Sequence, residues 1–227
     1  MLPTINLTSS RNIRIRSFEE DKNATLNVHR GLRYDGKIKG FFKFSGNFYL
    51  TNPQDELIES FEIAILLDKS YPNTFPIVFL LDDKIEKSDK YHIDQEGIIC
   101  FEHTYVSNVL ARGGLRLYDF VNYYLPKYFS WALVKKYGNA QDLKEWAHKE
   151  DGTKQFYEML LDTTDRNTIQ RFLEGYCKVT KIHRNDKCYC GNGKKLKHCH
   201  YDSATYLKAT PKQTILKDIV LFQEVCL

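Results

Sequence analysis

The chain has 227 residues, of which 42% are hydrophobic and 14% aromatic, and its formal net charge is +4. This apolar content suits a packed core and excludes an intrinsically disordered chain. No apolar run approaches the roughly 20 residues that a membrane-spanning helix needs, and the first residues lack the apolar core of a signal peptide. We therefore expect a cytoplasmic protein without a membrane partner, built of one sizeable domain and a smaller one.

The first half of the chain has the pattern of one helix followed by strands. Ser17 and Glu20 have the spacing of a capping box, which predicts a helix from Phe18 to His29. Three segments then have the apolar, β-branched or aromatic pattern of strands: residues 40–50, 57–67 and 77–81. The first contains Gly46, so it is either one strand or a hairpin. Consecutive strands with most helices after them predict an α+β fold, with one antiparallel meander of about four strands.

The second half has helical periodicity. Apolar residues recur at helical spacing from Leu115 to Lys136, and Pro126 is expected to kink or split this helix. Three shorter helices are predicted further on: Gly152–Leu161, Arg166–Cys177, and a last helix that opens at Thr210-Pro211. Asp151 is the expected N-cap of the first of these.

Three cysteines and one histidine with the spacing C-x-C-x8-C-H are the strongest signal in the chain: Cys188, Cys190, Cys199 and His200. Three thiolates and one imidazole complete the tetrahedral ligand set of structural zinc. Gly191 and Gly193 allow the tight turns that converging ligands need. Free or disulfide-bonded cysteines are the alternative, which a cytosolic location disfavours.

The stretch Arg184–His200 closely resembles the SEC-C motif, a small zinc knuckle found at the C-terminus of the SecA translocase and appended to many bacterial proteins. The likeness covers both ligand pairs, the C-G-x-G-K-K run and the leading Arg-Asn-Asp. It implies three segments: a main domain over 1–178, a zinc module over 179–205 and a C-terminal helix over 206–227.

A staple for the fold and a docking site for a partner protein are the preferred roles of this module. Contact with nucleic acid is disfavoured, because only four lysines cluster there and Tyr189 alone offers stacking. The four are Lys187, Lys194, Lys195 and Lys197.

Upstream, four features follow one another along the chain: Tyr71-Pro72, Phe75-Pro76, His92 and Gly97-x-x-Cys100. This order resembles the ubiquitin-conjugating (UBC) fold over roughly residues 40–137. In that family a meander ends in a Tyr-Pro turn, and a His-containing segment leads to G-x-I-C, whose cysteine carries ubiquitin as a thioester. The segment Trp146–Gly152 is similar to one in prokaryotic members, which occur in bacterial antiviral conjugation operons beside cGAS-like nucleotide synthases (CBASS systems).

The resemblance implies an enzyme: Cys100 accepts the C-terminal acyl group of a ubiquitin-like modifier or a cGAS-like nucleotidyltransferase, and transfers it to an amine in antiphage defence. An activating enzyme, or a substitute for one, must then exist. Eukaryotic enzymes carry His-Pro-Asn where this chain has His92-Ile93-Asp94, so the oxyanion role of that asparagine is open.

The residues around Cys100 allow a separate argument. Cys100 follows a glycine turn between a strand and a loop, which would place its thiol near the surface. His103 is a candidate for facing the thiol, and Asn108 is a candidate oxyanion donor. His92 is a weaker catalytic candidate, because hydrogen bonding that fixes the loop is its favoured role. The alternative is that Cys100 is a buried small hydrophobe after Ile98-Ile99.

The competing function is a catalytically inactive UBC-like domain that serves as a zinc-stapled protein-binding adaptor. An adaptor can bury the Cys100 sulfur, whereas a carrier cannot. Cys177 and Cys226 are assigned to apolar helical faces, so Cys100 is expected to be the reactive thiol outside the zinc site.

Overall fold

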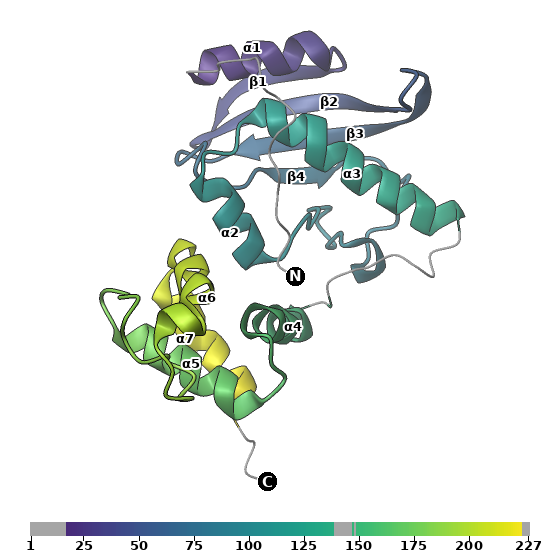
Figure 1. Cartoon of the computed structure of the whole chain (residues 1–227). Helices are drawn as coiled ribbons and strands as arrows, with labels where there is room; N and C mark the ends of the chain where they lie inside the picture. Colours follow the sequence, from purple (N-terminus) through teal and green to yellow (C-terminus); the bar gives the residue numbers. More distant parts are fainter. Residues whose placement is uncertain (1–16, 139–146, 148, 224–227) are drawn as a thin grey trace. The chain divides into compact units, whose positions relative to one another are not determined.

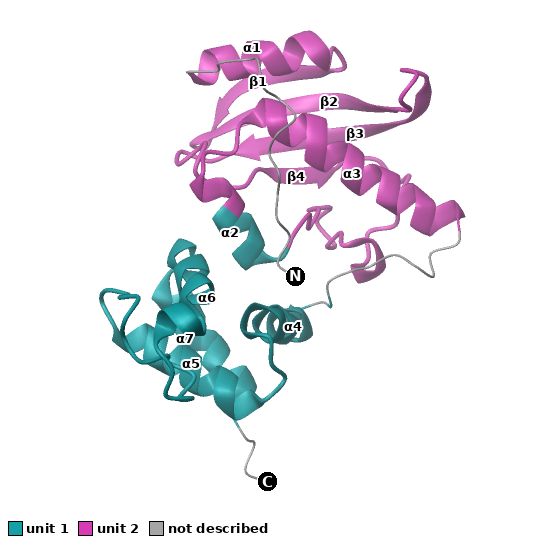
Figure 2. Cartoon of the chain, viewed as in Figure 1, with its two compact units in different colours: residues 1–5, 103–109, 146–227 teal, residues 6–102, 110–145 magenta. Residues whose placement is uncertain are grey.

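The computed structural model describes residues 17–138, 147 and 149–223, whose helices and strands are shown in Figure 1. Contacts divide the chain into two compact units, which Figure 2 colours separately. Of the described residues, unit 2 contains 17–102 and 110–138, and unit 1 contains 103–109, 147 and 149–223. The helices between residues 149 and 178 therefore belong to the same unit as the Cys/His motif, whereas the sequence placed them in the preceding segment.

Unit 2 is built on an antiparallel sheet, in which the described residues form four strands in sequential order. The strands are β1 (Leu32–Ile38), β2 (Phe41–Thr51), β3 (Leu57–Leu67) and β4 (Ile77–Leu80). Together with the helices of the chain, this sheet confirms the expected α+β class with an antiparallel meander. The finer likeness to the UBC fold stays a prediction.

The sheet decides between two expected alternatives and adds one strand that the sequence did not predict. β2 runs through Gly46 and pairs with β1 on one side and β3 on the other, so the hairpin alternative is wrong. A Cβ on Gly46 would lie 2.1 Å from the Gly31 carbonyl oxygen, so close backbone approach, and not a chain reversal, requires glycine there. β1 was not expected, because it includes Arg, Asp and Lys and is interrupted by a bulge near Gly36.

Helix α3 (Leu117–Tyr137) covers the apolar face of the sheet. The Phe129 ring stacks on Phe61 of β3 at 4.0 Å between centroids and on Phe48 of β2 at 5.6 Å. The helix is continuous through Pro126, so the expected split does not occur. Leu125 and Phe129 on either side of the proline are fully buried, and this packing favours one continuous helix over two separate ones.

Helix α1 (Phe18–Val28) begins where the capping box predicts, with the Ser17 hydroxyl accepting from the Glu20 N–H at 3.2 Å. A buried carboxylate on α1 caps α3. Asp21 accepts from the N–H of Leu117 at 2.8 Å and of Tyr118 at 2.9 Å, and the Tyr71 hydroxyl donates to it as well. The two helices are thereby joined through the first turn of α3.

Unit 1 is helical. Its α-helices from residue 149 on are α4 (Lys149–Leu161), α5 (Arg166–Lys178), α6 (Tyr201–Tyr206) and α7 (Lys212–Asp218). α5 matches the prediction within a residue. α4 starts three residues earlier than predicted, so Asp151 lies in its first turn and is not its N-cap. The last helix starts after Pro211 and continues as a 3-10 turn over Ile219–Phe222.

Helix α2 (Thr104–Arg112) was not expected, and the boundary between the units falls within it, after Val109. A hydrogen-bonded cluster buries its first turn in unit 1: Tyr105 donates to the Asp218 carboxylate, and the Tyr157 hydroxyl donates to the Tyr105 oxygen at 2.5 Å. None of the helices within the described residues combines the length and the apolar composition needed to cross a membrane. Trp146, His148 and Cys226 lie outside the described residues.

Candidate functional site

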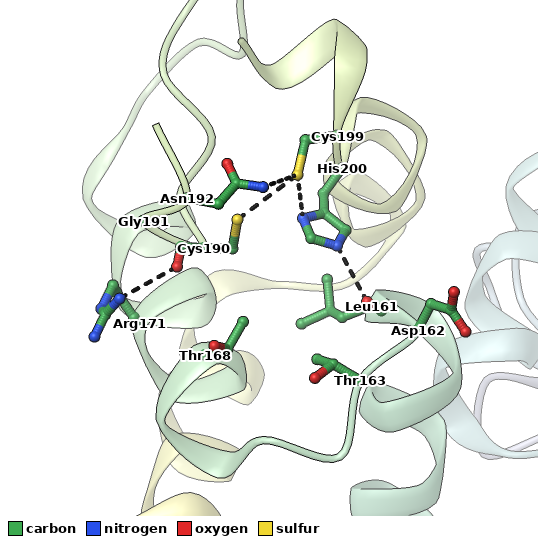
Figure 3. Close-up of a pocket in the computed structure, with 10 residues that line it drawn as sticks. All are labelled: Leu161, Asp162, Thr163, Thr168, Arg171, Cys190, Gly191, Asn192, Cys199 and His200. Atoms are coloured by element: carbon green, nitrogen blue, oxygen red, sulfur yellow. Dashed lines mark hydrogen bonds between the residues drawn. The ribbon is translucent and has the colours of Figure 1, made fainter. Parts of the chain in front are cut away.

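The four ligands predicted from the C-x-C-x8-C-H spacing come together in unit 1. The ligand atoms of Cys188, Cys190, Cys199 and His200 all lie within 4.8 Å of one another. The sulfurs of Cys190 and Cys199 are 3.7 Å apart, and His200 Nδ1 is 3.3 Å from the Cys188 sulfur and 3.1 Å from the Cys199 sulfur. Figure 3 shows three of the four side chains. This group can bind a metal ion.

The distances fit a tetrahedral site. Zinc bonds of about 2.3 Å to sulfur and about 2.0 Å to nitrogen place neighbouring ligand atoms roughly 3.5–3.8 Å apart. The three contacts given above differ from this range by a few tenths of an ångström at most, so small shifts would seat one ion. Burial and the neighbouring thiols raise the pKa of Cys188 to about 12, and only a bound cation offsets the cost of ionising such a thiol.

The histidine is oriented by a partner that sequence reasoning missed. His200 Nε2 lies 3.1 Å from the carbonyl oxygen of Leu161, the last residue of α4 (Figure 3). A carbonyl oxygen only accepts, so Nε2 carries the hydrogen and Nδ1 keeps its lone pair for a metal. No sequence signal identifies this contact, because 39 residues separate the two groups.

The segment Arg184–His200, which we call the knuckle, is held together by hydrogen bonds of its own backbone. The Cys188 N–H donates to the Lys194 carbonyl at 2.8 Å, and the Leu196 N–H donates to the Asp186 carbonyl at 2.7 Å. Gly191 has a φ of +84°, a conformation that other residues rarely adopt, so the predicted need for a glycine turn between the ligand pairs is confirmed.

Helix α5 supplies the apolar support. The Phe172 ring packs edge-on against the His200 ring at 5.4 Å and lies 5.7 Å from the Tyr189 ring. Leu196 is fully buried. A segment as short as the knuckle cannot bury enough apolar surface alone, and these contacts explain why it belongs to a larger helical unit.

A polar groove of about 430 Å³ lies beside the cluster, between the knuckle, the end of α4 and the first turns of α5. Its lining, drawn in Figure 3, comprises Leu161, Asp162, Thr163, Thr168, Arg171, Cys190, Gly191, Asn192, Cys199 and His200. Asn192 donates to the Cys199 sulfur at 3.0 Å. Such an N–H···S bond stabilises a thiolate and tunes a metal bound to it.

Cys100, in unit 2, is exposed. Its neighbour Ile99 is buried, and so is Ile93, which pairs with Ile99 in an isolated bridge. The Cys100 N–H donates to the His92 carbonyl at 2.8 Å, which fixes the backbone at the thiol. Gly97 has a φ of +89°, and a Cβ there would lie 2.7 Å from the Leu80 carbonyl oxygen, so the turn before the thiol requires glycine.

The thiol ionises poorly although the residue is exposed. Desolvation by the surrounding groups raises the pKa of Cys100, and the nearby charge of Glu102 raises it further. The thiol also points at the Glu102 carbonyl oxygen, 3.7 Å away. The Glu102 carboxylate pairs with Lys127 of α3 at 3.1 Å. Cys100 is therefore mostly a neutral thiol near pH 7.

The three other predicted catalytic residues lie in different surroundings. His92 has a left-handed backbone with a φ of +55°, and its ring lies 5.4 Å from that of Trp131. In unit 1, His103 lies parallel to the rings of Tyr105 and Phe156, which also stack on each other, and burial lowers the pKa of its imidazole. Asn108, also in unit 1, donates to the Thr210 hydroxyl at 3.3 Å. A catalytic contact of any of them with Cys100 stays a prediction.

Comparisons with protein-family models, with curated proteins and with solved structures found no match for this chain. The likenesses to the UBC fold and to the SEC-C motif therefore depend on the quoted residues alone.

Proposed function

We propose that this protein carries the C-terminal acyl group of a partner protein as a thioester on Cys100 and transfers it to an amine. The observation that best supports this proposal is the exposed position of Cys100, whose backbone N–H is hydrogen-bonded to the His92 carbonyl. A thioester carrier must be reached by two partners in turn, and an exposed residue at this position is compatible with that requirement.

The chemistry has two steps. In the first, the Cys100 sulfur attacks the carbonyl carbon of an activated acyl group; a sulfur–carbon bond forms, the bond to the leaving group breaks, and that group takes the proton of the thiol. In the second, an amine attacks the thioester carbon, a carbon–nitrogen bond forms, and the sulfur leaves with the electron pair and regains a proton from the amine.

The raised pKa of Cys100 has two consequences for this chemistry. A thiol that stays neutral near pH 7 reacts slowly on its own, so the activated partner must approach closely and help remove the proton. A thiol of high pKa is also a poor leaving group, so its thioester resists attack by water and survives until an amine is held beside it.

The setting we propose is bacterial antiphage defence, with a ubiquitin-like modifier or a cGAS-like nucleotidyltransferase as the acyl donor. The order of helix, four-strand meander and Gly97-to-Cys100 turn supports this proposal as a resemblance to the prokaryotic UBC branch. The zinc module would then serve as the structural staple of unit 1, because its ligands have the identities and distances of a closed Cys3His site.

An inactive, zinc-stapled adaptor is the second candidate function. The poorly ionising thiol favours it, as does the His92-Ile93-Asp94 segment, which lacks the asparagine of the eukaryotic enzymes. The adaptor would bind the same partners without a covalent step.

Intact mass spectrometry of a Cys100→Ser variant, expressed with the proteins encoded beside it, distinguishes the two functions. We expect a partner attached through an oxyester that resists reducing agent, while the unchanged protein carries a partner that reducing agent releases. Cys177→Ser is the matched control and should keep the reducible adduct. Cys100→Ala should lose the adduct with little change in melting temperature. A large fall would mark Cys100 as a core residue whose loss leaves a cavity, and absence of any adduct would favour the adaptor.

A further inference from the structure

Positive charge is concentrated on the Cys/His knuckle. Residues 178–197 contain seven lysine or arginine side chains and one acidic side chain, Asp186. The net charge of this segment is therefore +6, whereas that of the whole chain is +4, so the remaining residues sum to −2. All seven cations belong to exposed residues. The basic character of the protein thus resides in one short segment.

Five of these cations lie on the two arms of the knuckle, and we name them the basic ladder: Arg184, Lys187, Lys194, Lys195 and Lys197. Lys187 and Lys195 are paired in an antiparallel bridge, which puts their side chains on the same face. The Lys197 N–H donates to the Arg184 carbonyl at 2.9 Å, so the backbones of a second pair of cations are also adjacent.

Like charges opposite each other across such a bridge are destabilising unless an anion neutralises them. No carboxylate does so within residues 17–138, 147 and 149–223, where the basic ladder has no ion pair. Arg184 lies over the ring of Tyr201, at 4.8 Å from its centroid, and not against an acid. The knuckle therefore presents uncompensated charge to solvent.

The metal centre does not account for this charge. A divalent ion held by three thiolates and a neutral imidazole carries about one net negative charge. One lysine would offset it, and Asn192 already donates to the Cys199 sulfur. Most of the net charge of +6 on residues 178–197 is therefore available to attract an external anion.

The character of the surface selects the class of partner. The large apolar side chains that are exposed in the described chain all lie outside residues 178–210, so the knuckle lacks the apolar anchors on which protein interfaces depend. Four of the five cations are lysines, which bind phosphate groups as point charges. A regularly charged phosphate backbone suits such a surface.

Stacking on bases is not available from the one aromatic residue between the ligands. Tyr189 packs against Gly175 of α5, where an added Cβ would lie 2.9 Å from the Tyr189 Cβ, and against Phe172. Recognition would therefore be of phosphates and not of base identity.

We propose that the basic ladder binds the phosphate backbone of a nucleic acid without reading its sequence. From the sequence we disfavoured nucleic acid as a partner, because only four lysines cluster there. In the structure Arg184 lies beside Lys197 and joins these lysines, and no acidic side chain of the described residues neutralises the five cations. This binding needs no chemistry at Cys100 and is independent of the proposed acyl transfer.

The test is binding of the full zinc-loaded chain to fluorescent RNA and DNA duplexes of about 20 base pairs and random sequence, followed by anisotropy over a series of salt concentrations. Five phosphate contacts predict a slope of about −4 to −5 for the logarithm of affinity against that of salt. The variant Lys187→Gln/Lys195→Gln should weaken binding at least tenfold at low salt and reduce the slope by about 2. Because it removes a like-charge pair, it should not lower the melting temperature or the zinc content.

The matched control is Lys69→Gln/Lys208→Gln, which removes the same charge from exposed positions outside the ladder. It should leave the affinity and the slope unchanged. Three results would each overturn the proposal: no binding even at low salt, an equal loss in both double variants, or competition by polyglutamate as effective as that by unlabelled duplex.

Discussion

At the scale of single residues, Cys100 and His200 show opposite ways of handling a proton. Cys100 is exposed, yet desolvation and the charge of Glu102 raise its pKa and keep the thiol neutral. His200 has its protonated nitrogen specified by the Leu161 carbonyl, which leaves the other nitrogen free to bind a metal. The first arrangement suits a group that reacts only when a partner arrives, and the second suits a permanent ligand.

The electrostatic role of Glu102 leads to a prediction about labelling. Alkylation by iodoacetamide follows the thiolate fraction, so for Cys100 the rate should keep rising above pH 9.0, the ordinary pKa of a thiol. Glu102→Gln removes a negative charge and leaves the Lys127 cation nearby, so the pKa should fall and the rate at pH 8 should rise by about 2- to 10-fold.

Peptide mapping by mass spectrometry measures the rate for each cysteine. Glu96→Gln is the matched control, because Glu96 is exposed and is not among the groups that shift the pKa of Cys100. An unchanged rate in Glu102→Gln would contradict the assigned cause. Faster labelling of Cys177 than of Cys100 in the native protein would contradict the view that Cys100 is the accessible thiol of the pair.

At the scale of elements, the contact between α1 and α3 depends on one carboxylate. Asp21 is buried, with 2% of its surface exposed, and it accepts hydrogen bonds from two N–H groups at the start of α3 and from the Tyr71 hydroxyl. Burial raises the pKa of Asp21, while the N–H groups of Tyr118 and Leu117 act in the opposite direction. The hydrogen bonds that join α1, α3 and Tyr71 through this carboxylate offset the free-energy cost of its desolvation.

Removing this cap should destabilise the protein. Asp21→Ala leaves the Tyr118 N–H and the Tyr71 hydroxyl without their acceptor, and leaves the Leu117 N–H with the Tyr71 oxygen alone, so we expect a loss of about 2–3 kcal/mol in the free energy of unfolding. Urea unfolding followed by circular dichroism measures it. Asp83→Ala, at a carboxylate whose side chain is 98% exposed, should change the stability by less than about 0.5 kcal/mol. Equal effects of the two substitutions would show that the cap contributes nothing.

At the scale of the whole molecule, the two units have separate cores with different sources of stability. Unit 2 has a large aromatic core around Phe44, Phe61 and Phe129, all fully buried. Unit 1 combines a helical core with a Cys/His cluster whose surrounding segment is short and polar. The metal-dependent part of folding should therefore be confined to unit 1.

Metal removal tests this division. The purified protein should contain about one zinc per chain, as a closed four-ligand site requires. After treatment with a chelator, trypsin should cleave at the lysines between residues 179 and 205, while the sheet of unit 2 stays protected. Mass spectrometry of the fragments locates the cuts, and Cys188→Ser should give the same fragments without chelator. Zinc-free protein with unchanged resistance, or loss of protection in both units, would contradict the assignment.

Features that depend on residues a few positions apart could be predicted from the sequence alone. The capping box at Ser17 sets the start of α1, and the apolar and β-branched pattern of residues 57–67 defines β3 to the residue. The metal ligands were recognised because two pairs of short spacing bring their own chelating geometry, with glycine turns between them. Local sterics and hydrogen bonding decide each of these, so the sequence contains the information.

Only the tertiary structure decided the features that join distant segments. Gly46 is required because the Gly31 backbone approaches it across the sheet, and α3 stays continuous at Pro126 because its flanking residues are buried. The Leu161 carbonyl orients His200 across 39 residues, and the cap by Asp21 spans 96. Such contacts leave no pattern in the local sequence. Any carbonyl or carboxylate at the same position in space could accept the hydrogen bond, and the packing of the chain determines which group occupies that position.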